Sequence, residues 1–140
     1  MPRIARLKME GEPAVYHVMS RTALDGFVLE DVEKDYLLKL IKKLSRVYFS
    51  EVVGFSVMGN HFHLLVRMHP GDGYDDEEVK RRYRVYYGED SQREVNDEDT
   101  IQDLREKWCN LSEYVKEIKQ DFSRFYNRRD NRKGFSSRSV

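Results

Sequence analysis

A run of alternating residues near the middle of the chain, positions 61–68, is the feature that most constrains the fold. Successive side chains on a β-strand point to opposite faces, so the alternation predicts a strand with two unlike surfaces. We expect the apolar surface to pack on a core and the other surface to be open to chemistry. The apolar surface consists of Phe62, Leu64, Val66 and Met68, and the other consists of His61, His63, Leu65 and Arg67.

The second surface carries two imidazoles separated by one apolar residue. Imidazole is a common ligand for divalent first-row ions, and two ligands fixed on one strand cost little entropy to assemble. Such a pair is half of a metal site, because further carboxylate, amide, phosphate or water oxygens must complete the coordination. The alternative is a strand with two half-buried histidines that form hydrogen bonds to their neighbours. The spacing alone leaves both interpretations open.

The sequence on either side predicts the partner strands. Residues 51–58 are rich in β-branched and aromatic side chains, and Gly59-Asn60 is short enough for a two-residue antiparallel hairpin to the histidine strand. Asn60 would lie at the hairpin tip beside His61, as a turn former or as an outer partner of the site. Residues 15–20 form another strand that ends near the turn dipeptide Asp25-Gly26.

Two amphipathic helices complete this arrangement. Apolar residues recur at intervals of three and four from Asp31 to Tyr48, with acidic residues at the start, where the helix dipole favours them. The last long helix begins at Asn110, an N-cap with Glu113 three residues later. It ends near Asn127, and we expect residues 127–134 to form a basic loop suited to phosphates.

The order strand, helix, two-stranded hairpin, helix is most of a ferredoxin-like βαββαβ domain of the α+β class, with a fourth strand at residues 135–140. In such a domain the helices cover one face of an antiparallel sheet. The apolar surface of the histidine strand would face the helices, which leaves His61 and His63 on the open face. The agreement between these elements favours a ligand site over two incidental histidines.

Length and composition bound the rest. A chain of 140 residues predicts a single domain, residues 1–140, with an acidic helical insertion at about 69–109. Lysine and arginine number 25, as do aspartate and glutamate, yet the middle of the chain is acidic and its end is basic. A phosphate backbone would be met by the regions that flank the acidic segment. The single cysteine, Cys109, and the lack of a long apolar run predict a cytoplasmic protein without a membrane partner.

The insertion has two interpretations. A helix from about Asp75 to Tyr87 would place basic side chains beside tyrosines, a combination that can grip single-stranded nucleic acid through stacking and phosphate contacts. Packing and solubility explain the same residues. Residues 97–99 are a loop or a helix start. The basic residues in question are Lys80, Arg81, Arg82 and Arg84.

Three segments together carry a family resemblance. They are Tyr16-His-Val-Met-Ser-Arg21, Met58-Gly-Asn-His-Phe-His-Leu-Leu-Val66 and the helical pattern from Leu111 to Asn127. With the helix at 31–48, they resemble the single-tyrosine transposases of the insertion-sequence class, and within it the REP-associated tyrosine transposases of bacteria. The resemblance covers roughly residues 14–68 and 108–134.

The resemblance implies an HUH endonuclease, a relaxase-like fold that cleaves and transfers single-stranded DNA during transposition. In that family the two histidines, here His61 and His63, hold Mg²⁺ or Mn²⁺, which polarises the scissile phosphate, and a helix-borne tyrosine attacks it. The product is a 5′-phosphotyrosine link and a free 3′-hydroxyl. The family usually works as a homodimer on DNA hairpins, so the resemblance also implies single-stranded or hairpin DNA as the partner.

The resemblance does not reach the nucleophile. The subgroup continues beyond the equivalent of Gly134 with a strand and a helix that carries the tyrosine, and we expect that helix to be missing here, since residues 135–140 are short. Tyr126 is the first substitute and Tyr114 the second, although both also suit aromatic packing. Gln120 and Asp121 are candidates for a third metal ligand. His17 and His69 are interpreted as a strand histidine and a loop histidine.

The basic end of the chain supplies the candidate DNA contacts, which are Lys116, Lys119, Arg124, Arg128, Arg129, Arg132 and Lys133. Three functions follow from the residues and the resemblance. The first is metal-dependent cleavage and transfer of a single DNA strand. The second is a DNA hairpin-binding remnant or regulator that lacks the nucleophile helix. The third is a metal-independent RNA-binding domain, which would tolerate the loss of both histidines.

Overall fold

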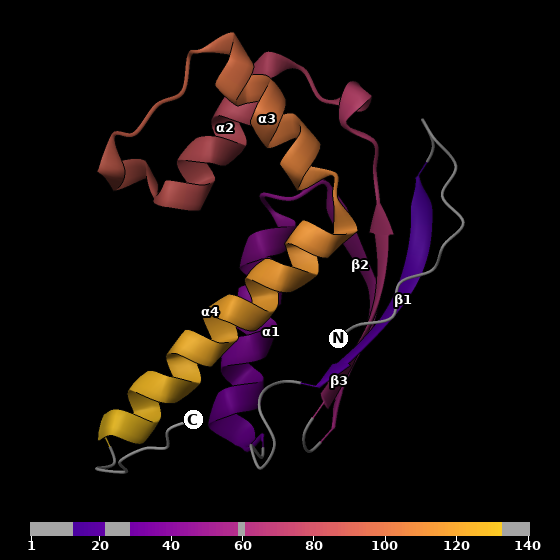
Figure 1. The fold of residues 1–140 in the computed structure, drawn as a ribbon, viewed down its shortest axis with the longest axis vertical. Coiled ribbons are helices and arrows are strands. Elements are labelled where there is room, and N and C mark those ends of the chain that lie inside the picture. Colours follow the sequence, from indigo (N-terminus) through magenta and orange to yellow (C-terminus); the bar gives the residue numbers. More distant parts are fainter. Residues whose placement is uncertain (1–12, 22–28, 59–60, 133–140) are drawn as a thin grey trace.

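The computed structural model describes residues 13–21, 29–58 and 61–132 of the chain, with most of their side chains (Figure 1). It contains three strands, four α-helices and two short 3-10 turns in these ranges. The strands are β1 (Ala14–Arg21), β2 (Ser50–Met58) and β3 (His61–Met68); the α-helices are α1 (Asp31–Ser45), α2 (Asp76–Tyr87), α3 (Glu98–Trp108) and α4 (Leu111–Arg132); the 3-10 turns are η1 (Gly71–Gly73) and η2 (Glu89–Ser91).

The three strands form one antiparallel sheet in the order β1-β3-β2. The predicted α+β class and the three predicted strands are therefore confirmed, and β3 with its histidines is the central strand. A bulge interrupts the β2 ladder between Val52 and Gly54. The predicted turns at Asp25-Gly26 and Gly59-Asn60 and the predicted strand at residues 135–140 lie outside the described residues.

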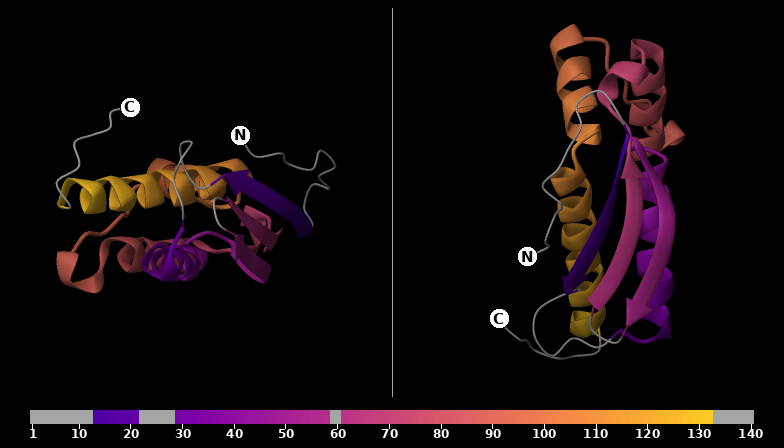
Figure 2. Two further views of the ribbon diagram at one scale, coloured as in Figure 1. Left: turned by 90° about the horizontal axis from the view of Figure 1, so that it is seen from below. Right: turned by 90° about the vertical axis from the view of Figure 1, so that its right-hand side faces the viewer.

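Helices α1 and α4 lie side by side on one face of the sheet, and they leave its other face uncovered by the described helices (Figure 2). The covered face follows the period of two that the sequence shows. On β3 it consists of Phe62, Leu64, Val66 and Met68, all buried, and on β1 it consists of Tyr16 and Val18, also buried. The predicted division of β3 into an apolar and an open surface is confirmed for these residues.

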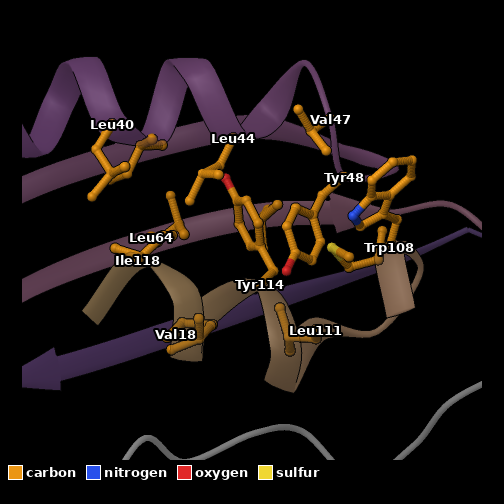
Figure 3. Close-up of a cluster of buried hydrophobic side chains, with 14 of the residues drawn as sticks. Val18, Leu40, Leu44, Val47, Tyr48, Leu64, Trp108, Leu111, Tyr114 and Ile118 are labelled. Atoms are coloured by element: carbon orange, nitrogen blue, oxygen red, sulfur yellow. The ribbon is translucent and has the colours of Figure 1, made fainter. Parts of the chain in front are cut away.

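The core lies between this face and the two helices (Figure 3). Leu44 from α1, Leu64 from β3 and Ile118 from α4 are almost completely inaccessible to solvent. Burial of such a side chain stabilises the fold by roughly 1.5–3 kcal/mol. Tyr48 and Tyr114 fill the same core, with their ring centres 5.2 Å apart. This packing fixes α4 against the sheet.

The insertion between β3 and α4 packs at the end of the sheet where β3 finishes, away from His61 (Figure 1). Its anchor is Arg82 of α2, whose Nη1 donates to the carbonyl oxygens of Val47 and Tyr48 at 3.1 and 2.9 Å. The guanidinium also lies 5.2 Å from the ring centre of Phe49. The insertion is thus held by polar and cation–π contacts as well as by apolar burial.

The helix starts follow the predicted capping residues. The side chain of Asn110 accepts the backbone N–H groups of Ser112 and Glu113 at 2.8 and 3.2 Å. Asp97 accepts the N–H of Thr100 at 2.9 Å, which settles the 97–99 segment as a helix start. Among the described helices, none combines the length and the apolar character that crossing a membrane requires.

Two helix ends differ from the prediction. The first helix ends at Ser45, because Val47 and Tyr48 turn inward to fill the core. The predicted basic loop after Asn127 is wrong over residues 127–132, where α4 continues to Arg132. This stretch holds neither glycine nor proline to stop a helix, and cations at a helix C-terminus are favoured by the dipole.

Candidate functional site

The candidate site centres on the first residues of β3. His63 is partly buried on the open face of the sheet, between Met19 of β1 and Ser56 of β2, its direct partners in the two ladders. His61 is paired in the same way with Arg21 and Met58. Its side chain lies outside the described part of the structure. Because His61 and His63 are two residues apart in one regular strand, they belong to the same face.

A second histidine contacts His63 from the neighbouring strand. His17 of β1 is exposed on the open face, and its Nε2 lies 3.2 Å from Nδ1 of His63. The two ring planes are inclined by only 11°, with centres 5.3 Å apart. The nitrogens approach each other much more closely than the ring centres do, so the rings meet edge to edge. This is the geometry of an imidazole–imidazole hydrogen bond.

The sequence pattern predicts His17 only as a strand histidine. The alternation Tyr16-His17-Val18 places His17 on the open face, but the pattern does not say which residue of β3 it meets. That depends on the strand register, in which His17 pairs with Leu65 and lies diagonally across from His63. Diagonal neighbours on one face of a sheet are within reach of ring side chains. The register is therefore the information that brings the two histidines together.

The rest of the open face is apolar at its centre and charged at its far end. Val15, Met19 and Leu65 are exposed there, although each is hydrophobic. Near the end of β3, Arg67 donates to the carboxylate of Glu51 at 3.0 Å, and His69 lies 3.6 Å from the same carboxylate. The hydrogen bond from Arg67 lowers the pKa of Glu51. This carboxylate is thus engaged at the opposite end of β3 from His61.

The chemistry of the donors decides whether a divalent ion fits. In the described part of the chain, no group of three or more histidine, cysteine, aspartate or glutamate side chains converges on one point. Two imidazoles from one strand therefore supply a partial ligand set, which water and phosphate oxygens would complete. Mg²⁺ commonly keeps several waters and binds substrate phosphates, and imidazole suits the transition metals. The two imidazoles therefore fit a divalent ion only together with such oxygens.

The candidate third ligands lie elsewhere. Asp121 is on α4 in the helical layer, and its carboxylate accepts the hydroxyl of Tyr36 at 2.7 Å. Burial of Tyr36, together with this hydrogen bond, raises the pKa of its phenol to about 12. Gln120 is exposed on the same helix. Because α4 covers the face of the sheet opposite to His63, the structure does not bring these two residues to the histidine.

The two candidate tyrosines also belong to the helical layer. Tyr114 is completely buried, its hydroxyl lies 2.9 Å from Oγ of Ser45, and burial raises its pKa. Such a phenol is inaccessible to a DNA strand in this conformation. Tyr126 is half-buried near the end of α4, with its ring centre 6.3 Å from that of Phe122. Of the two, only Tyr126 has a surface that a substrate can approach.

The candidate DNA contacts follow α4 toward the end of the molecule at which β3 begins (Figure 1). Lys116, Arg124 and Arg128 are exposed, and Lys119 is half-buried. Arg129 and Arg132 belong to α4 but have side chains outside the described part, and Lys133 lies beyond it. The last turns of α4 therefore place basic residues at the same end of the molecule as the histidines, in the other layer.

The basic residues of α2 have a different role. Arg82 is anchored in the fold as described above, and Arg81 and Arg82 both donate to Glu78 at 2.7 Å. These contacts lower the pKa of Glu78 to about 2, and the hydrogen bond from Arg81 is the largest cause. Lys80 lies 3.6 Å from Glu77, and Arg84 is exposed. Packing and ion pairing thus account for three of the four basic residues.

Comparison with known proteins identifies the region that carries the site. The family model for the IS200-like transposases matches residues 12–76, which include β1, α1, β2 and β3 with all four histidines of the chain. Over this segment, which is less than half of the chain, the protein is similar to the IS200-like transposases. The predicted transposase resemblance is thereby confirmed. No curated protein and no solved structure matches the chain.

Proposed function

We propose that this IS200-like protein is a metal-dependent transposase that cleaves and rejoins single-stranded DNA, with His61 and His63 as its metal ligands. The observation that carries the proposal is the position of His63. It lies inside the segment that matches the transposase family, on the face of the central strand that the described helices leave uncovered. The proposed fold is the ferredoxin-like HUH arrangement, in which a fourth strand completes the sheet.

A bound Mg²⁺ or Mn²⁺ would supply Lewis acidity toward the scissile phosphate. His61 and His63 would hold the ion, and the open face would admit the substrate. In the cleavage step the phenol oxygen of a tyrosine bonds to phosphorus and the P–O3′ bond breaks. The proton of the phenol ends on the released 3′-hydroxyl. The products are a 5′-phosphotyrosine and a 3′-hydroxyl, and the reverse attack rejoins strands without ATP.

We assign the nucleophile to Tyr126, since it is the accessible member of the candidate pair on α4. The basic residues of α4, together with Lys133, which follows it in the sequence, would bind the backbone of a single-stranded or hairpin DNA through charge. They comprise Lys116, Lys119, Arg124, Arg128, Arg129, Arg132 and Lys133. The active species in this proposal is a homodimer, as the resemblance implies.

The test is incubation with Mn²⁺ and a labelled single-stranded DNA hairpin, followed by a denaturing gel. We expect a covalent protein–DNA adduct that depends on Mn²⁺ and is lost in His61→Ala, His63→Ala and Tyr126→Phe. The matched control is His69→Ala, which removes an imidazole beside Glu51 at the other end of β3 and should retain the adduct. An adduct that persists in His63→Ala would refute the metal assignment.

A second candidate function is binding of DNA hairpins without cleavage. The observation that favours it is the separation of layers, since Tyr126 lies on the helical layer whereas His63 lies on the opposite face of the sheet. Under this alternative the hairpin is retarded on a native gel, no adduct forms on a denaturing gel, and Tyr126→Phe changes neither result. An adduct that survives in Tyr126→Phe would instead place the nucleophile on another tyrosine.

A further inference from the structure

The contact between His17 and His63 connects a residue outside the predicted ligand pair to the candidate site. The two histidines come from different strands, 46 positions apart in the chain, and their ring nitrogens are 3.2 Å apart. Both residues lie inside the segment that matches the transposase family. A contact of this kind requires one ring to donate an N–H and the other to accept it, so it selects the tautomer of both rings.

We propose that His17 is a positioning residue that holds His63 ready to coordinate a divalent ion through Nε2. His63 donates its Nδ1–H to Nε2 of His17, which fixes both the tautomer and the orientation of the His63 ring. Histidine ligands commonly donate their second ring N–H to an outer partner, and this bond raises the basicity of the ligating nitrogen. The inference rests on the proposed assignment of His61 and His63 as ligands.

The strand register distinguishes this role from direct coordination. Along the antiparallel ladder, Arg21 pairs with His61, Met19 with His63 and His17 with Leu65. His63 therefore lies between His61 and His17 along the sheet. An ion shared by His61 and His63 lies on the His61 side, and His17 supports the ring from the other side. Because Nδ1 of His63 takes part in the contact with His17, the ion would be coordinated through Nε2 of His63.

The ring planes support the same role. The two imidazoles meet edge to edge with nearly parallel planes, 11° apart, which is the arrangement that a linear N–H···N bond favours. Two side chains on the exposed face of a sheet have many rotamers, and a bond between them removes that freedom before the ion arrives. Preorganisation of this kind increases affinity because less entropy is lost on binding.

The first measurement uses the metal-free protein. Nitrogen-15 NMR of labelled histidine reports which ring nitrogen carries the proton, and we expect the Nδ1–H tautomer for His63. In His17→Phe the tautomer should revert to a mixture, whereas His17→Gln should retain it because the amide oxygen accepts the same hydrogen bond. The matched control is Val15→Phe, which adds an equal ring on the same face of β1 and should leave His63 unchanged. An unchanged tautomer in His17→Phe would overturn the proposal.

The second measurement is the affinity for Mn²⁺ alone, by calorimetry, with electron spin-echo spectroscopy to count the coordinated imidazoles. Loss of an outer partner typically weakens metal binding by about 10- to 100-fold, and we expect this for His17→Phe with smaller losses for His17→Gln. The number of coordinated imidazoles should stay the same. A drop by one imidazole would make His17 a ligand and contradict the positioning role.

The two measurements separate this proposal from the proposed function. If His63→Ala binds Mn²⁺ as tightly as the natural protein, the ligand assignment fails, and the metal-positioning role fails with it. The tautomer then still reports whether the contact between His17 and His63 exists in solution. If His63→Ala loses binding while His17→Phe retains full affinity, the ligand assignment stands and only the role of His17 is refuted.

Discussion

The two faces of the sheet are built from the same strands, yet they differ in what they contribute. On the face under α1 and α4, Val18 and Leu64 are completely buried. On the other face the adjacent residues Met19 and Leu65 are 49% and 36% exposed. The covered face therefore stabilises the fold, whereas the side chains of the open face bury little apolar surface. This division explains how His17 and His63 can be placed for chemistry at little cost to the core.

The polar contacts of the two faces differ in the same way. The hydroxyl of Tyr36 on α1 donates a hydrogen bond to the carboxylate of Asp121 on α4 at 2.7 Å, and the Tyr36 ring stacks on Phe125 with ring centres 3.8 Å apart. These two contacts tie the covering helices together. The corresponding polar contact on the open face is the ion pair between Arg67 and Glu51, whose side chains are well exposed. Exposed ion pairs contribute little to stability because water and salt screen them.

The sharpest test of the comparison uses neighbouring leucines of β3. Leu64→Ala should lower the free energy of unfolding by about 2–5 kcal/mol, because it opens a cavity in a closely packed core. Leu65→Ala removes the same atoms from the open face and should cost about 0.5 kcal/mol, the range of surface substitutions. Urea denaturation of both variants measures the difference. Equal losses would show that the open face is covered in solution.

The next prediction concerns the open face alone. If His61 and His63 hold a divalent ion, Mn²⁺ at a free concentration 100-fold above its Kd should stabilise the protein by about 2.7 kcal/mol. His63→Ala should abolish this gain without changing the stability of the metal-free protein much, since its side chain lies outside the core. Thermal unfolding with and without Mn²⁺ measures both quantities. The same gain in His63→Ala would point to binding at another place.

The smallest expected effect concerns the contact between the covering helices. Tyr36→Phe keeps the ring that stacks on Phe125 but removes the hydrogen bond to Asp121, and it should cost about 0.5–1.5 kcal/mol at neutral pH. The matched control is Glu51→Gln, which breaks the ion pair on the open face and should leave stability unchanged. If Glu51→Gln were the more damaging of the two, the assignment of stability to the covered face would be wrong.

The same phenol predicts a dependence on alkaline pH. The pKa of Tyr36 is raised from 10.0 to about 12 in the folded protein, so its stabilising contribution is complete below pH 10. It is lost as the pH rises toward 12, because ionisation becomes easier in the unfolded chain than in the folded one. The advantage of the natural protein over Tyr36→Phe should therefore be constant up to about pH 10 and shrink between pH 10 and about pH 12. A constant difference across this range would show that burial and the hydrogen bond to Asp121 do not raise the pKa of Tyr36.

Much of the candidate site could be predicted from local patterns. The alternation at 61–68 assigned each residue of β3 to a face, and the hairpin brought β2 beside it. The role of Arg82 could not be predicted in this way. Its basic and aromatic surroundings suited both nucleic-acid binding and packing, and the hydrogen bonds from Arg82 to the carbonyl oxygens of Val47 and Tyr48, at 3.1 and 2.9 Å, decide for packing. Contacts between distant segments leave no periodic signal in the sequence.

The candidate tyrosines illustrate the same limit. Tyr114 and Tyr126 both lie on the predicted last helix, and the sequence could rank them only by their neighbours. The structure separates them, because Tyr114 points into the core beside Ser45 whereas Tyr126 is half-buried. It also places both on the layer opposite to His63. A helix pattern gives the face of a residue on its own element, but the side of a sheet on which that helix packs follows from the whole fold.

The sequence by itself determined which residues of β1 and β3 face the helices and which face away, since a strand alternates with a period of two and apolar side chains seek burial. It also showed which family the histidine segment resembles. Only the tertiary structure decided that His17 meets His63. That contact depends on the register between β1 and β3, which is set by the packing of the shared core, and a shift of one residue would turn His17 to the other face.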